Sequence, residues 1–207
     1  MSVTAQCSVP ALVVMLTLSC PGSPLFPGIS VASSPNGTFV ITSEFTLGRD
    51  LGGGAHEVEN EIFRVHQRIA INNERDAFRT LISFWGTRWS FDIDRKSNAW
   101  AMTGNFPLVT DDGEVVVLVN IAPAMSSTME VFRIYRRTGT IGRLVRTVHL
   151  NQLWTQQALA SIPTNMAFTD RSPQWFAGGA FNFSSDSQQL IHTTRWGNTV
   201  AIRLTSD

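Results

Sequence analysis

Residues Thr110–Val119 read TDDGEVVVLV and give the clearest indication of the fold. A tight polar turn is followed there by a continuous apolar run, which is typical of a strand buried on both faces. Two similar turns, at Ser34–Gly37 (SPNG) and Ser184–Ser187 (SSDS), also lead into apolar runs. The starting positions 34, 110 and 184 are almost evenly spaced, which predicts repeated antiparallel β units.

The chemistry of these turns explains their residue types. An Asp or Asn side chain accepts a hydrogen bond from the backbone two residues further on, and glycine supplies the positive φ of a tight hairpin turn. The third turn has Ser187 where glycine would lie, so we expect that turn to be less tight.

The body of the chain, from residue 29 onward, has the pattern of short strands bounded by turns. Besides 115–119, strands are expected at 38–43, 91–94, 99–102, 129–136, 143–150 and 199–204. Short helices are expected at 73–81 and at 151–159, the second with Asn151 as N-cap. The glycine-rich segment 48–55 is expected to be a flexible loop.

These patterns predict an all-β, antiparallel fold in a single repeat domain at 33–207. Its packing is either propeller-like, with incomplete or degenerate blades, or an open sandwich of about three four-stranded units. The units are expected at 29–104, 105–178 and 179–207.

Composition limits the partners. The 207 residues contain 16 acidic and 16 basic side chains, which gives no reason to expect nucleic acid. Lys96 is the only lysine, so the basic residues are almost all arginine. Such a bias indicates either recognition of planar anions or merely a GC-rich genome.

The first 32 residues contain no charged side chain, and Ala11–Leu18 is an apolar run too short to span a bilayer as a helix. Cleavage after Ala32 would fit an exported bacterial protein, secreted or periplasmic, and Cys20 would fit a lipid anchor. A start codon assigned too far upstream would instead leave a cytoplasmic protein. Both cysteines, Cys7 and Cys20, lie in this segment, so no thiol chemistry is expected in the body.

The turns and the strands that follow them resemble the starts of blades in bacterial β-propeller proteins. The resemblance is carried by Ala180–His192 with the strand at 197–202, and by a central region with Trp100 before the Asp-Asp-Gly turn and Tyr135 ending a later strand. That region is similar to a group of uncharacterised, usually exported, propeller-like proteins. Closed propellers typically have four or more blades, whereas three turns imply at most three. The resemblance implies no catalytic residues and no cofactor.

The densest group of possible metal ligands lies in one segment. Its members are His56, Glu57, Glu59, Glu61 and His66. The spacing is not that of a His-Glu-x-x-His motif. The segment is therefore either a metal-dependent hydrolase site or an exposed acidic strand edge that discourages aggregation.

Aromatic residues beside arginine suggest a second kind of site. Exposed tryptophans would be stacking platforms for sugars or peptide side chains, with arginine adding cation–π contacts, whereas buried ones would be core residues. The candidates are Trp85, Arg88, Trp89, Trp175, Arg195 and Trp196. A binding groove would then lie where loops 44–60, 83–90 and 170–180 gather.

The sequence predicts a non-catalytic binding or scaffold module whose ligand is a glycan or a protein. The alternative is the metal-dependent hydrolase. No integral membrane span is expected, and a third alternative is a protein that works only as an oligomer.

Overall fold

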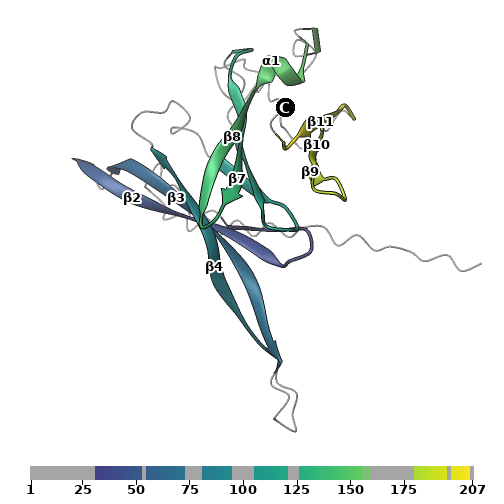
Figure 1. Cartoon of the computed structure of the whole chain (residues 1–207). Coiled ribbons are helices and arrows are strands. Elements are labelled where there is room, and N and C mark those ends of the chain that lie inside the picture. The colour runs from purple at the N-terminus through teal and green to yellow at the C-terminus, as the bar shows by residue number, and fades with distance from the viewer. Residues whose placement is uncertain are drawn as a thin grey trace, which may run out of the picture.

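The computed structural model describes residues 31–52, 55–72, 81–94, 105–120, 126–155, 157–158, 180–194 and 197–205. Within them the chain is all-β, as predicted, with one short helix (Figure 1). The strands are β1 (Val31–Ser33), β2 (Phe39–Gly52), β3 (Ala55–Asn72), β4 (Leu81–Asp94), β5 (Asn105–Val109), β6 (Val115–Asn120), β7 (Glu130–Thr138), β8 (Ile141–His149), β9 (Ala180–Phe183), β10 (Gln189–Thr193) and β11 (Thr199–Arg203). Helix α1 (Leu150–Leu153) follows β8 directly.

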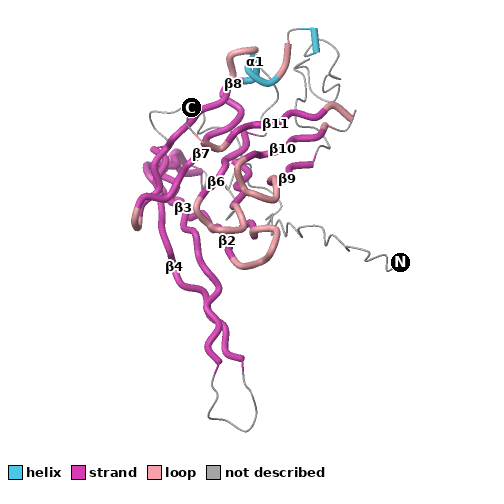
Figure 2. The backbone as a smooth tube through the Cα atoms, turned by 45° about the vertical axis from the view of Figure 1, so that its right-hand side comes forward, coloured by secondary structure: helices cyan, strands magenta, loops and turns pink. Residues whose placement is uncertain are grey.

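The strands form three antiparallel meanders, which are β1–β4, β5–β8 and β9–β11. A parallel pair, Ser90 with Ile141, joins β4 to β8 and makes one eight-stranded sheet of the first two meanders. The strands at the two ends of that sheet, β1 and β5, lie close together, so the sheet is nearly closed. The third meander is a separate sheet beside the second (Figures 1 and 2). This arrangement is compatible with both predicted kinds of packing, the propeller-like one and the sandwich.

Strand β6 lies at the centre of the fold because it contributes to two hydrophobic cores. Val116 and Leu118 point to the core between the first and second meanders, beside Phe63 and Trp89. The alternate side chains of β6 point to the core shared with the third meander; they are Val115, Val117 and Val119. All five are almost fully buried, and burying each stabilises the fold by about 1.5–3 kcal/mol. The prediction of a strand buried on both faces is confirmed.

The three predicted turns are confirmed as hairpin turns between β1 and β2, β5 and β6, and β9 and β10. In each, the first side-chain hydroxyl donates to the side-chain oxygen of the third residue, at 2.8, 2.5 and 2.6 Å. That same oxygen accepts the backbone N–H two residues further on. The fourth residue has positive φ, +55° at Ser187 and close to +70° at the two glycines. The third turn is therefore as tight as the others, contrary to the expectation, because Ser187 itself adopts the left-handed conformation.

Two further local predictions were wrong. Segment 48–55 is not a loop, since Gly48–Gly52 continues β2 and pairs with β3 through register shifts, and Ala55 already belongs to β3. The predicted helix at 151–159 is interrupted: its first turn has His149 as N-cap and ends at Trp154 in an extended conformation, and residues 157–158 are helical again. Of the other expected helix, 73–81, only Leu81 is described, and it begins β4. The expected strand at 99–102 lies outside the described residues.

In the part of the chain that the structure describes, no helix has the length and apolar character needed to cross a bilayer.

Candidate functional site

A bulge in β4 decides where Arg88 and Trp89 point. Trp89 pairs with Val65 of β3 and Thr87 pairs with His66, so Arg88 is an extra residue without a partner on β3. An extra residue bends the strand and redirects its side chains. Both Arg88 and Trp89 consequently reach the second meander, where the Trp89 indole N–H donates to the carbonyl oxygen of Gly113 at 2.7 Å.

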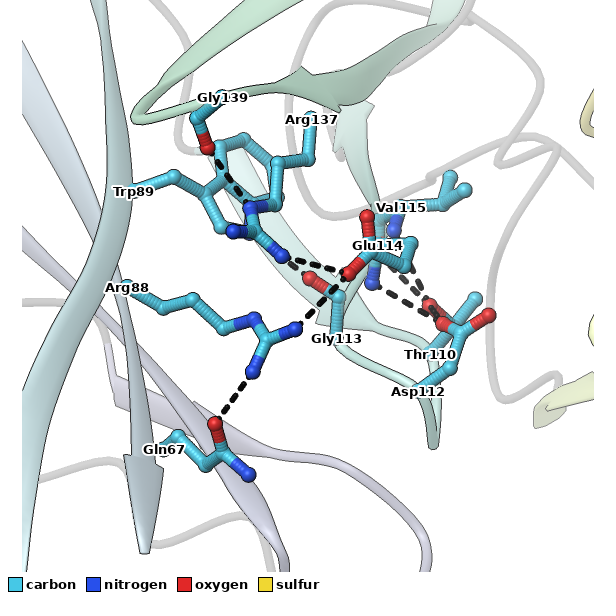
Figure 3. A network of polar contacts seen from close by, with 10 residues as sticks. All are labelled: Gln67, Arg88, Trp89, Thr110, Asp112, Gly113, Glu114, Val115, Arg137 and Gly139. Carbon is cyan, nitrogen blue, oxygen red and sulfur yellow. Dashed lines mark hydrogen bonds and ion pairs between the residues drawn. The ribbon is translucent and has the colours of Figure 1, made fainter.

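Arg88 belongs to a polar network that connects the first two meanders (Figure 3). Its Nη1 donates to Gln67 Oε1, and its Nη2 lies 3.3 Å from Glu114 Oε1. Arg137 Nη1 donates to the same carboxylate oxygen at 2.8 Å, while Arg137 Nε donates to the carbonyl oxygen of Gly139 at 2.8 Å. Two guanidinium groups thus share one carboxylate.

This network positions the hairpin formed by β7 and β8. Gly139 lies in its turn and Arg137 shortly before it. The backbone N–H of Ser90 donates to the carbonyl oxygen of Thr140, also in the turn, at 3.1 Å. Gly142 lies so close to the Trp89 ring that a Cβ atom there would be 2.3 Å from Trp89 Cζ3. We conclude that Trp89 and Arg88 anchor the hairpin to the first meander.

The opposite face of this hairpin carries three arginines. Arg136 and Arg143 are directly opposite each other across β7 and β8, and Arg146 pairs with Ile134 further along. Because side chains alternate along a strand, these three point away from the face on which Arg137 and Gly142 meet the first meander. Arg136, Arg143 and Arg146 are called the arginine face below.

The arginine face has no anionic partner within the described residues. No carboxylate of the described residues forms an ion pair with Arg136, Arg143 or Arg146. Arg146 Nη1 donates to the backbone carbonyl oxygen of Arg203 on β11 at 3.2 Å, and no described carboxylate compensates its charge. Like charges directly opposite in a sheet are destabilising, so the pair of Arg136 and Arg143 costs stability unless an anion lies over it.

A groove of about 270 Å³ adjoins the arginine face at Arg146. It lies between β8, α1 and β11, and its lining combines polar Arg146, Gln152 and Arg203 with apolar side chains such as Leu153 and Val200.

The two described tryptophans among the aromatic candidates, Trp85 and Trp89, do not lie together. Trp85 is 48 % exposed, but it pairs with Arg68 and lies on the face of β4 opposite Trp89. Trp89 is 1 % exposed, and the cation–π contact of Arg88 is with Phe39, 5.8 Å from its ring centre. Trp175, Arg195 and Trp196 lie outside the described residues.

The loops expected around a binding groove are strands where the structure describes them. Segment 83–90 lies within β4, and 44–60 is the hairpin of β2 and β3, of which residues 53–54 are not described. Most of 170–180 lies outside the described residues as well.

The described members of the candidate metal group do not converge. Glu61 is 1 % exposed, whereas His66 lies on the other face of β3, between Thr42 Oγ1 at 3.0 Å and Thr87 Oγ1 at 3.1 Å. Burial, and secondly the charge of Arg64, lower the pKa of His66. No three metal-binding side chains of the described residues form a group, and the side chains of His56 and Glu57 are not among them.

The alternative expectation for that segment, an exposed acidic edge, is wrong for Glu61. Strand β3 lies between β2 and β4 rather than at an edge, and Glu61 points to the interior. Glu59 is half-buried and has an interaction partner of its own.

Sequence reasoning missed the arginine face, although a signal for it was present. Arg136 lies three residues before Gly139 and Arg143 lies three residues after Thr140, so a turn at 139–140 pairs them across the hairpin. What the sequence could not show is which part of this face the third meander leaves uncovered.

Comparison with known proteins gives no relative from which a role could be transferred: the chain matches no family model, no curated protein and no solved structure.

Proposed function

We propose that this protein is a non-catalytic binding module of the propeller-like type, and that its ligand presents carboxylate groups to the arginine face. The observation that carries the proposal is the direct pairing of Arg136 with Arg143 without any carboxylate of the described residues nearby. Arg143 is exposed and Arg136 is half-buried, so both guanidinium groups are accessible to a ligand.

The chemistry of arginine supports a carboxylate ligand. A guanidinium group is planar and presents paired N–H donors that match the two oxygens of a carboxylate. Two such groups side by side, with Arg146 beyond them, would bind a row of carboxylates rather than a single one. Peptides rich in Asp or Glu and uronate-containing glycans both have such rows.

The fixed position of the hairpin of β7 and β8 also supports the proposed function. Arg137, Glu114 and Arg88 fix the opposite face of the hairpin, and Gly142 packs against Trp89. A ligand therefore meets side chains on a backbone that is already held in place, which lowers the entropic cost of binding.

The test is binding of two carboxylate polymers, polyglutamate and polygalacturonate, to the full chain at low and at physiological salt. We expect at least one to bind, and to bind more weakly as salt rises. An Arg136→Gln, Arg143→Gln double variant should lose about tenfold in affinity, because each exposed charge pair contributes about 0.7 kcal/mol.

The matched control is the double variant Arg49→Gln, Arg68→Gln, which removes two exposed arginines of the first meander. It should keep the affinity of the unaltered chain. Equal losses in both double variants, or no binding of either polymer, would refute the proposed function.

A further inference from the structure

Among the described strands, none pairs with the outer edge of β8 over most of its length. Strand β7 pairs with β8 from Ile141 to His149 on one side. On the other side, β4 meets β8 at the single pair of Ser90 and Ile141, and the bond from Ser90 to Thr140 lies at the same end. From 143 to 148, no described strand pairs with that edge.

The side chains along this edge are unusual for an exposed strand. Ile141 is 52 % exposed and Leu144 is 49 % exposed, so β8 carries two of the five large apolar side chains that are exposed in the described residues. Arg143 and Arg146 come between and after them. Exposed apolar side chains and arginines thus lie along a row of backbone N–H and C=O groups that no described strand pairs, which is a template for a further strand.

We propose that an extended acidic segment of a partner protein adds to the open edge of β8 as a further strand, opposite residues 143–148. This inference rests on the proposed function and specifies its ligand. In strand addition, backbone hydrogen bonds supply affinity and alternate side chains supply specificity. Every second residue of the segment would place a carboxylate on the arginine face.

The intervening residues of the added strand would lie on the other face of the sheet. Leu144 is the exposed side chain there, because its cross-strand partner Tyr135 points to the first meander. The partner segment should therefore alternate acidic with apolar residues. A row of carboxylates on a glycan could meet the arginines but could not supply the backbone bonds or fill the space beside Leu144.

The experiment compares three labelled heptapeptides that alternate Glu and Val: the unmodified peptide, one N-methylated at each Val, and one N-methylated at each Glu. N-methylation removes backbone donors from one edge of a strand and leaves the charge unchanged. We expect the unmodified peptide to bind the full chain and at least one methylated peptide to lose tenfold or more in affinity. Amide hydrogen exchange at 143–148 should slow when the unmodified peptide is bound.

The outcomes separate this inference from the proposed function. If all three peptides bind equally, or if polygalacturonate binds and the unmodified peptide does not, strand addition is refuted while recognition of carboxylates stands. If neither polymer nor any peptide binds, both fail, and the edge arginines only protect β8 from aggregation. Loss of peptide affinity in the Arg136→Gln, Arg143→Gln variant, with retention in Arg49→Gln, Arg68→Gln, supports the assigned face.

Discussion

Replacing Gly142 with alanine would place a methyl group against the buried ring of Trp89. The added Cβ atom would lie 2.3 Å from Trp89 Cζ3 and 3.1 Å from Phe91 Cδ1, whereas carbon atoms in contact are about 3.5–4.0 Å apart. The ring cannot easily retreat, because its N–H is bonded to Gly113 and it stacks on Phe91 at 5.7 Å. Either the hairpin of β7 and β8 moves outward or the ring leaves its site.

Overpacking of this kind costs about 1–3 kcal/mol. Restricting the unfolded chain at residue 142 returns about 0.4–1 kcal/mol. Because an approach of 2.3 Å to the ring puts the overpacking cost at the upper end of its range, we expect Gly142→Ala to lower the free energy of unfolding by about 2 kcal/mol. For a urea dependence of about 2 kcal/mol per molar, the unfolding midpoint falls by about 1 M.

Two companion variants isolate the cause. Gly139 lies three residues earlier, and nothing lies within 4 Å of a Cβ atom placed there, so Gly139→Ala costs only the strain of its φ of +67°, about 1 kcal/mol. In a Trp89→Leu background the ring is gone, and Gly142→Ala should then cost less than about 0.5 kcal/mol. If Gly142→Ala costs the same in both backgrounds, the contact between Gly142 and Trp89 does not hold the hairpin.

Two further predictions concern the turns and the first meander. Asp112→Ala should lower the free energy of urea unfolding by about 1 kcal/mol, because Thr110 and the backbone of Glu114 both donate to that carboxylate. Asp112→Asn should cost little, because Asn36 already has this role in the first turn. Equal losses in the two variants would contradict the assigned bonds. In an NMR titration His66 should protonate below the ordinary pKa of 6.5, and Arg64→Gln should raise its midpoint by removing a nearby positive charge. Because the unfolded chain then binds a proton that folded His66 lacks, stability should fall as pH drops through 6.5 towards the lower folded pKa, and a stability independent of pH in that range, or a midpoint at or above 6.5, would refute the assignment.

Local sequence was enough to predict the features that depend only on neighbouring residues. The three turns need a hydroxyl side chain at the first position, Asp or Asn at the third, and Gly or Ser at the fourth, because the bonds that form them are all local. The apolar run at 115–119 was enough to place β6 between two cores, since every face of such a strand must be buried. The strands expected at 129–136 and 143–150 are confirmed as β7 and β8 for the same reason. All-β architecture is the sum of these local signals.

Packing between the meanders determines which side chains are buried and which are exposed. The residues around Glu61 do not show that β3 becomes an interior strand, because that depends on the pairing of β2 and β4 on its two sides. The glycine-rich end of β2 is extended because β3 pairs with it, against its own weak strand preference. Because of the bulge at Arg88, two candidate binding residues, Arg88 and Trp89, instead anchor the hairpin of β7 and β8 to the first meander. The arginine face is exposed because of how far the third meander extends over β7 and β8, which is a property of packed sheets and not of any stretch of sequence.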